Sequence, residues 1–199
     1  MKTIIAIGRE YGSGGREIGE RLAKEFNIPF YDKELLAEAA RESGISEEAF
    51  IENDEKHNRS FLYSLAIGGY GSGNLPFNHK LFLAQFDAIR ALANQGPCVI
   101  LGRCADYALE DNPNCLSVFI HADIKSRIER AVKYYDVPEN NAEKVIIKTD
   151  KMRANYYNFY SDRKWGDANN YHLTIDSSFF GIDKTIEIIK KTVEAMEER

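Results

Sequence analysis

The sequence contains no long run of apolar residues. Its first apolar segment, Thr3–Ile7, stops at Gly8, and the charged residues Arg9 and Glu10 follow directly. A helix that spans a bilayer needs about 18 to 20 consecutive apolar residues, and a signal peptide needs a longer apolar core than this segment provides. The sequence therefore predicts neither a membrane span nor a signal peptide.

Cysteine and histidine are also scarce, with three cysteines and four histidines in 199 residues. The cysteines are odd in number and form no Cys-x-x-Cys pair, and the histidines show no metal-ligand spacing. This pattern excludes a disulfide framework and a zinc knuckle, and it is typical of a reducing compartment. We therefore expect a cytosolic enzyme or binding domain. The residues concerned are Cys98, Cys104, Cys115, His57, His79, His121 and His172.

An excess of basic charge is missing as well. Lysine and arginine number 26 against 31 aspartates and glutamates, which leaves a net charge of −5. A protein that coats nucleic acid needs a basic surface, so this class is excluded. The charge is uneven, because residues 32–56 hold nine acids against three bases, whereas residues 121–165 hold ten bases against seven acids. The second region is suited to an anionic small molecule.

The order of apolar segments predicts the fold class. With 44% hydrophobic and 29% charged residues, the chain has the composition of one globular domain. We expect strands near residues 3–7, 29–31, 98–101, 116–120 and 171–175. We expect helices at residues 15–26, 33–43, 79–94, 138–157 and 182–196, and others that begin near residues 46 and 123. Strands that alternate with helices predict an α/β domain with a mainly parallel sheet, and ligands of such sheets bind beyond the carboxyl ends of the strands.

A glycine-rich segment, GREYGSGGRE, joins the first expected strand to the first expected helix. Backbone amides of such a loop can surround a phosphate, and the helix adds its positive amino end. The dinucleotide pattern G-x-G-x-x-G fails because Glu17 replaces its last glycine. The mononucleotide pattern G-x-x-x-x-G-K-[ST] fits imperfectly: with Gly14 as its second glycine, Arg9 takes the first glycine position, Gly15 the lysine and Arg16 the hydroxyl. A glycine turn that only joins strand to helix is the alternative.

A second candidate feature is the segment ILGRCAD, in which an expected strand ends at Gly102 and Arg103, with Asp106 close behind. An arginine at this end of a strand, in a sheet that also carries a phosphate loop, is well placed to bind a phosphate or an acceptor ring. A surface ion pair is the alternative.

A third feature is the basic and aromatic region from residue 127 to 165. Arg127 and Arg130 lie three residues apart on one helix face, as do Asp150 and Arg153. Taken alone, such pairs equally indicate exposed ion pairs. The tyrosines between residues 156 and 160 predict either packing or a lid, and packing is favoured.

Taken in order, six segments resemble the cytidylate kinase-like P-loop proteins, relatives of bacterial cytidylate kinase within the nucleoside monophosphate kinases. The segments are IAIGREYGSGGREIGERLA, IPFYDKELL, CVILGRCADYAL, VFIHADIKSRIERAV, TDKMRANYYNFYSDRKWGD and NYHLTID. They cover nearly the whole chain. The phosphate loop marks a branch of its own, because GSGGRE replaces the usual GSGKGT.

The resemblance implies a three-layer P-loop kinase fold of the α/β class, with a mainly parallel five-stranded sheet flanked by helices, a helical insertion and a lid. Residues 1–199 would form one domain. Its core would comprise residues 1–31, 79–124 and 167–199, its monophosphate-binding insertion residues 32–78, and its lid residues 125–166. The implied activity transfers the γ-phosphoryl group of ATP to a nucleoside monophosphate such as CMP, with Mg²⁺. No nucleic-acid or membrane partner is expected, and the oligomeric state is left open.

The resemblance also implies site residues. The phosphate-binding loop would comprise Gly12, Ser13, Gly14, Gly15, Arg16 and Glu17. The acceptor would be bound by Arg103, Asp106, Asp150 and Arg153. The catalytic cations would be Arg16, Arg127, Arg130 and Arg153. Because Gly15 replaces the usual lysine, Arg16 is expected to supply the missing charge, and Glu17 or Asp106 to hold Mg²⁺ through water.

The missing lysine keeps two alternatives open. Phosphoryl transfer depends on positioning and on cancelling oxygen charge with lysine, arginine and metal ions. A nucleotide-binding protein with weak or lost kinase activity is therefore one alternative. A kinase of another small acceptor is the second, because little in the sequence selects cytosine.

Overall fold

The computed structural model describes residues 1–32 and 77–198 of the chain. Within these ranges, five strands form one parallel sheet in the order β2-β3-β1-β4-β5. The strands are β1 (Ile4–Arg9), β2 (Phe30–Tyr31), β3 (Val99–Leu101), β4 (Cys115–His121) and β5 (Leu173–Asp176). The predicted α/β class and the five-stranded parallel sheet are confirmed.

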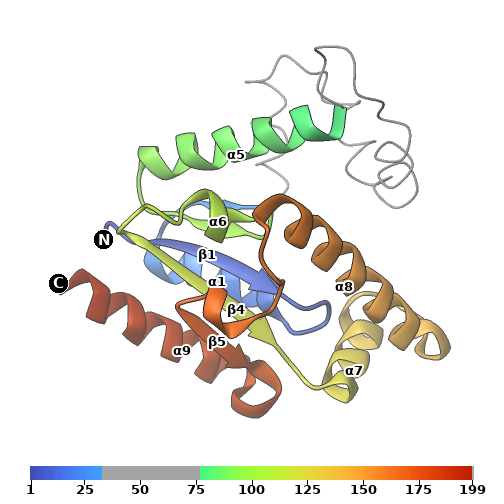
Figure 1. Cartoon of the computed structure of the whole chain (residues 1–199). Coiled ribbons are helices and arrows are strands. Elements are labelled where there is room, and N and C mark those ends of the chain that lie inside the picture. The colour runs from blue at the N-terminus through green and yellow to red at the C-terminus, as the bar shows by residue number, and fades with distance from the viewer. Residues whose placement is uncertain (33–76, 199) are drawn as a thin grey trace, which may run out of the picture.

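Helices cover both faces of the sheet (Figure 1). They are α1 (Gly15–Phe26) and α9 (Ser177–Glu197) on one face, and α5 (Phe77–Gln95) with the short α6 (Ala105–Ala108) on the other. Successive side chains of a strand point to opposite faces. Ile5 and Ile7 of β1 therefore enter the core beneath α1 and α9, whereas Ile4 and Ala6 enter the core beneath α5 and α6.

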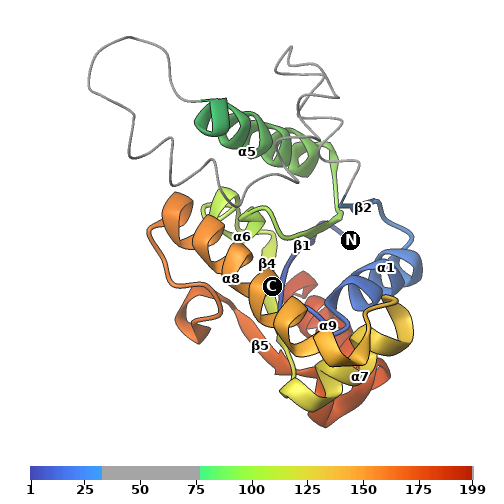
Figure 2. The ribbon, with the colours of Figure 1, turned by 90° about the vertical axis from the view of Figure 1, so that its right-hand side faces the viewer.

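Two more helices lie beyond the carboxyl ends of the strands, side by side in Figures 1 and 2. They are α7 (Ile124–Tyr134) and α8 (Glu139–Ser161). Asp123 begins α7 as predicted, because its carboxylate accepts hydrogen bonds from the backbone N–H groups of Lys125 and Ser126 at 2.9 and 3.0 Å. Apart from Ile124, both helices fall within residues 125–166, the expected lid. That this region moves as a lid stays a prediction.

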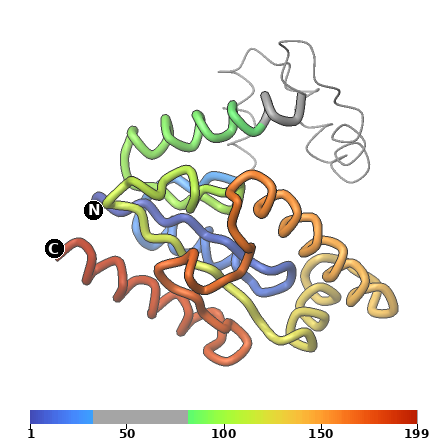
Figure 3. Tube along the Cα trace, in the orientation of Figure 1, coloured from blue at the N-terminus to red at the C-terminus, as the bar shows by residue number. Residues whose placement is uncertain are grey.

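The two termini lie at the opposite edge, away from α7 and α8 (Figure 3). There the Glu197 carboxylate accepts hydrogen bonds from the backbone N–H groups of Lys2 and Thr3, both at 2.8 Å. The edge that carries the glycine-rich loop is therefore far from the chain ends. No helix in the described ranges combines the length and the apolar character that crossing a membrane requires.

Apart from shifts of a few residues at other element ends and a short 3-10 helix at Ala168–Asn170, two elements differ from the sequence prediction. The closing helix was expected at residues 182–196, but α9 begins at Ser177, because the Asp176 carboxylate caps it. Gly181 has φ 73° and ψ 166°, so it interrupts the helical backbone at the point where the apolar periodicity begins. The helix α6 was not predicted, because four residues are too few to show helical periodicity.

Part of the prediction lies outside the described residues. The helices expected at residues 33–43 and from residue 46 fall there, as does all but the ends of the expected monophosphate-binding insertion, residues 32–78.

Candidate functional site

The glycine-rich loop connects β1 to α1 and is held from two sides. Gly12 has φ +83°, and a Cβ atom at this residue would lie 2.7 Å from the carbonyl oxygen of Arg127 in α7. The Ser13 hydroxyl donates to the Glu10 carbonyl at 2.9 Å, and the Ser177 hydroxyl of α9 donates to the Ser13 carbonyl at 2.6 Å. The loop therefore has a shape that α7 and α9 both support.

The loop leaves the amino end of α1 open to an anion. Gly14 caps the helix with φ 78° and has no side chain to accept a hydrogen bond. The first N–H group that bonds within the helix is that of Ile18, which donates to the Gly14 carbonyl at 3.0 Å. Unpaired N–H groups and the helix dipole together favour a phosphate at such an end.

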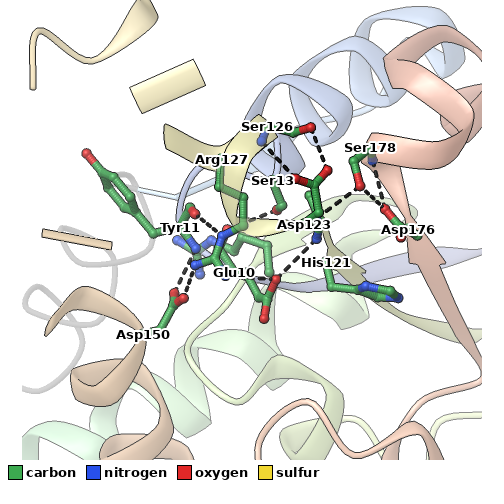
Figure 4. A network of polar contacts seen from close by, with 12 residues as sticks. Glu10, Tyr11, Ser13, His121, Asp123, Ser126, Arg127, Asp150, Asp176 and Ser178 are labelled. Atoms are coloured by element: carbon green, nitrogen blue, oxygen red, sulfur yellow. Dashed lines mark hydrogen bonds and ion pairs between the residues drawn. The ribbon is translucent and has the colours of Figure 1, made fainter. Parts of the chain in front are cut away.

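Arg127 is the centre of a buried polar network between the loop and the two helices (Figure 4). Its Nη1 atom lies 3.1 Å from a Glu10 carboxylate oxygen, and its Nε atom donates to the Tyr11 carbonyl at 2.8 Å. It also forms an ion pair with Asp150 of α8. The Asp150 carboxylate in turn accepts a hydrogen bond from the Tyr11 N–H group at 2.8 Å. The predicted residues Arg127 and Asp150 are therefore brought together at the loop.

Arg130 lies one turn further along α7 and also faces the loop. It forms an ion pair with Glu17, and its guanidinium group lies over the ring of Tyr134 at 4.9 Å from the ring centre. A Cβ atom at Gly14 would lie 3.3 Å from the Arg130 guanidinium carbon. Arg130 thus stands beside the amino end of α1, where it can contact a bound phosphate.

Arg16 turns toward the end of β2 and away from the amino end of α1. Its Nη1 atom lies 2.5 Å from Glu20 and its Nε atom 3.1 Å from Asp32, and half of the side chain is exposed. Two carboxylates therefore already offset its charge. The expectation that Arg16 replaces the lysine of the phosphate loop stays a prediction.

A cavity of about 270 Å³ adjoins the loop at the carboxyl ends of β1 and β3. Three arginines and one acid line it, together with two glycines, a cysteine, a methionine and four aromatic residues. The lining comprises Arg9, Arg103, Arg153, Asp106, Gly8, Gly102, Cys104, Met152, Tyr156, Tyr157, Trp165 and Tyr171. A cavity lined by both cationic and aromatic side chains suits an anion that carries a ring. Three of the four expected acceptor residues, Arg103, Asp106 and Arg153, are therefore found together. The fourth, Asp150, does not line the cavity and pairs with Arg127 at the loop.

The acid of the cavity, Asp106, is buried. Burial raises the pKa of its carboxyl group, although the Tyr157 hydroxyl, which donates to it at 2.6 Å, opposes that shift. Arg153 links the cavity to the loop: its Nη1 atom donates to the Arg9 carbonyl at 3.1 Å, and its guanidinium carbon lies 5.7 Å from the centre of the Tyr11 ring.

The tyrosines of α8 both pack and line the cavity. Tyr160 stacks on Phe82 of α5 with the ring centres 3.9 Å apart, and the Tyr156 hydroxyl donates to Gln85 at 2.7 Å. Tyr156 and Tyr157 also face the cavity. The sequence favoured packing alone. The structure shows that Tyr156 both contacts α5 and lines the cavity.

The carboxylates near the loop do not form a ready metal site. Among the described residues, no group of three acids, histidines or cysteines could hold a metal ion. Glu17 is paired with Arg130 and with Arg21, and Asp106 accepts a hydrogen bond from the Tyr157 hydroxyl at 2.6 Å. Mg²⁺ is commonly held by one or two carboxylates together with the phosphates of a ligand, so the loop fits a metal ion only together with a phosphorylated ligand.

Sequence reasoning did not assign several residues that the structure places at the site, among them Arg9, Glu10, Asp32 and Tyr157. Arg9 had a signal, because it occupies a glycine position of the phosphate-loop pattern. The others had none, because their roles depend on partners that are far away in the sequence. Tyr157 and Asp106, for example, are 51 positions apart.

The chain is similar in sequence to known proteins. A sequence model of the cytidylate kinase-like family matches residues 4–179. A cytidylate kinase from Methanopyrus kandleri is 23% identical over an alignment of 208 positions, which covers 100% of this chain and 97% of the relative.

Solved structures are similar over nearly the whole chain. The crystal structure of an uncharacterized protein from Eubacterium ventriosum ATCC 27560 has 34% identity and a TM-score of 0.75, covering 97% of this chain and 99% of that chain. A shikimate kinase from Bacteroides thetaiotaomicron has 13% identity and a TM-score of 0.55, with 98% and 99% covered. At that identity the likeness shows the fold alone, which is that of the P-loop kinases.

Proposed function

Because the chain belongs to the cytidylate kinase-like family, we propose that it transfers the terminal phosphoryl group of ATP to a nucleoside monophosphate. The observation that carries the proposal is the cavity lined by Arg9, Arg103 and Arg153, which adjoins the open amino end of α1. A phosphate-binding loop beside a separate cationic cavity offers places for a donor and an acceptor, as a phosphotransferase requires.

The donor side is the glycine-rich loop. The N–H groups at the amino end of α1 would bind the phosphates of ATP, and Arg130 stands beside them. Arg127 would position the loop, since it binds Glu10 and the Tyr11 carbonyl. If a phosphate displaced a carboxylate from either arginine, that arginine would offset charge on the transferred group.

The acceptor side is the cavity. Arg103 and Arg153 would bind the monophosphate, and Tyr156 and Trp165 would face the base. Asp106, held by Tyr157, offers a carboxyl group that donates or accepts a hydrogen bond according to its protonation. Base selection would depend on this group and on residues of the insertion.

Mg²⁺ would offset further phosphate charge. The nucleotide itself would hold the ion, and Glu17 would contact it through water. A cytosolic location follows from the same proposal, because the substrates are available there.

One observation favours the second candidate function, a nucleotide-binding protein with weak turnover. Gly15 stands at the lysine position, and Arg16 is paired with Glu20 and Asp32. Such a protein would use the same loop and cavity for binding alone.

The test is formation of ADP and a nucleoside diphosphate from ATP and each of CMP, dCMP, UMP, AMP and GMP, with Mg²⁺ present. Turnover with at least one acceptor, abolished in Arg153→Met, is the expected result. Calorimetric binding of ATP and a monophosphate without turnover would select the second candidate. If the protein binds neither nucleotide, both functions are wrong.

A further inference from the structure

Arg9 and Gly15 stand at two related positions of the phosphate loop. The pattern G-x-x-x-x-G-K-[ST] has a glycine at the first position and a lysine at the seventh. With Gly14 as the second glycine, this chain has arginine at the first position and glycine at the seventh. The small residue and the cation have therefore exchanged places.

The structure shows that the two changes depend on each other. A Cβ atom at Gly15 would lie 2.6 Å from the Cβ atom of Arg9 and 3.1 Å from its Cγ atom. Carbon atoms in contact lie about 3.5 to 4.0 Å apart, so no larger residue fits at position 15 while Arg9 keeps this conformation. A lysine at the usual position and the Arg9 side chain as placed here exclude each other.

The head of Arg9 reaches the cavity. The side chain leaves the end of β1, crosses Gly15 and packs its Nη1 atom on Gly102, where a Cβ atom would collide with it. Two glycines, from α1 and from the end of β3, thus leave room for one arginine. Its guanidinium group lines the cavity together with Arg103 and Arg153.

This guanidinium group has no hydrogen-bond or ion-pair partner within residues 1–32 and 77–198. The charges that act on it are those of Arg153, Asp32, Arg103 and Arg16, three cations and one acid, and the acid is already paired with Arg16. Burial and the neighbouring arginines lower the pKa of Arg9 to about 9, which still leaves it charged at neutral pH. An enclosed cation among other cations is costly unless an anion joins it.

We propose that Arg9 binds the terminal phosphate of the donor nucleotide in place of the phosphate-loop lysine. It would reach this phosphate from the end of β1, whereas the usual lysine reaches it from the first turn of α1. The identity of the ligand as ATP rests on the proposed function. The binding of a polyphosphate by Arg9 does not depend on it. Arginine suits this place because its planar group can bind two phosphate oxygens at once. Arg9 would then lie between the donor loop and the acceptor arginines, where the transferred group passes.

The test is a reciprocal exchange of the two residues, with affinity for inorganic tripolyphosphate and for ATP measured by calorimetry. Arg9→Gly should lower both affinities about 30-fold, since it removes a charge-assisted pair of hydrogen bonds. Gly15→Lys alone should also bind more weakly and should unfold at a lower temperature, because the new side chain meets Arg9. The double variant, Arg9→Gly with Gly15→Lys, restores the pattern G-x-x-x-x-G-K and should regain most of the lost affinity.

Two more variants separate phosphate binding from folding. Arg9→Met keeps the stem of the side chain over Gly15 and removes the charge, so it should fold normally and lose affinity as Arg9→Gly does. Arg90→Gln changes an arginine of α5 outside the cavity, whose Nε atom donates to the Ala108 carbonyl, and should bind as the unaltered protein does.

The inference is overturned if Arg9→Met keeps the affinity for tripolyphosphate, if the double variant binds no better than Arg9→Gly, or if the unaltered protein binds no polyphosphate. Failure of the proposed function is distinct. It would appear as tripolyphosphate binding that depends on Arg9, without phosphoryl transfer to any monophosphate.

Discussion

Arg127 of α7 and Asp150 of α8 form an ion pair against the backbone of Tyr11. Each also bonds to that residue, Arg127 to its carbonyl and Asp150 to its N–H group, both at 2.8 Å. The pair therefore fixes the peptide groups of the phosphate loop as well as the two helices. The shape of the loop depends on this contact between helices beyond the sheet.

Removing Asp150 should weaken the whole fold. Among the residues that the structure describes, Asp150→Ala leaves the buried Arg127 with only Glu10 as a charged partner, and it leaves the Tyr11 N–H group without its acceptor. Breaking a buried pair from one side typically costs about 3 kcal/mol or more. We expect a loss of about 3 kcal/mol in the free energy of unfolding, measured by urea denaturation.

A matched control is the exposed pair between Lys190 and Glu25, whose charged groups are 2.6 Å apart on α9 and α1. Glu25→Ala should change the unfolding midpoint far less than Asp150→Ala, because water screens an exposed pair. Equal shifts in the two variants would contradict the role given to Asp150.

Loss of Arg103 should affect the acceptor and not the donor. Arg103 lines the cavity and would bind the monophosphate, so Arg103→Met should raise the KM for the acceptor about 30-fold. The KM for ATP should change less than about threefold, because the donor binds at the loop. Steady-state kinetics with either substrate varied separates the two.

Arg163→Met is the matched control for Arg103→Met in these kinetics. Arg163 pairs with Glu110 and lies over the ring of Tyr107 at 5.2 Å, outside the cavity. It should leave both KM values unchanged. A rise in the KM for ATP in Arg103→Met, with no change for the acceptor, would assign Arg103 to the donor.

Stability should depend on pH through Asp106. Burial raises the pKa of its carboxyl group in the folded protein above the ordinary value of 3.8. The folded state therefore binds the proton more tightly than the unfolded state, and stability falls as pH rises from 3.8 to the folded pKa. Asp106→Asn has no charge to bury and keeps an acceptor for Tyr157. The free energy of unfolding of Asp106→Asn, relative to that of the unaltered protein, should rise across this window. The rise should be about 1.4 kcal/mol for each pH unit between the unfolded and the folded pKa of Asp106.

The measurement is urea unfolding at a series of pH values from 3 to 8. Tyr157→Phe provides a check, because its hydroxyl lowers the pKa of Asp106, and removing it should extend the window to higher pH. A constant difference between Asp106→Asn and the unaltered protein at every pH would show that this carboxyl group does not titrate differently on folding.

Close contact between the loop and α7 should make Gly12 intolerant of any side chain. Gly12→Ala adds a methyl group 2.7 Å from the Arg127 carbonyl, at a backbone φ of +83°. Gly181 has a similar φ of +73° but open space around it. Gly181→Ala should therefore cost only backbone strain, about 1 to 3 kcal/mol, because φ 73° with ψ 166° is a conformation that essentially only glycine adopts. Gly12→Ala adds the collision with Arg127 to the strain of its positive φ, so it should cost clearly more and weaken ATP binding. Thermal unfolding of both variants makes the comparison, and equal losses would refute the contact.

The sequence by itself determined the parallel sheet, because the patterns that indicate its strands and helices lie within short stretches of the chain. Apolar runs that end in glycine indicate buried strands, and the stripe of Ile18, Leu22 and Phe26 indicates a helix. The start of α7 followed from Asp123, and the position of the phosphate loop followed from its glycines. Each of these depends on residues close together in the chain.

Only the tertiary structure decided which charges meet. Arg127, Asp150 and Glu10 come from three separate segments, and nothing in the spacing shows that they share one network. The same holds for the cation of the phosphate loop. Arg16 follows the lysine position directly and was the expected substitute, but its side chain turns to Asp32, whereas Arg9 crosses Gly15 to the cavity. Side-chain direction depends on packing between segments distant in sequence, which residue order alone does not contain.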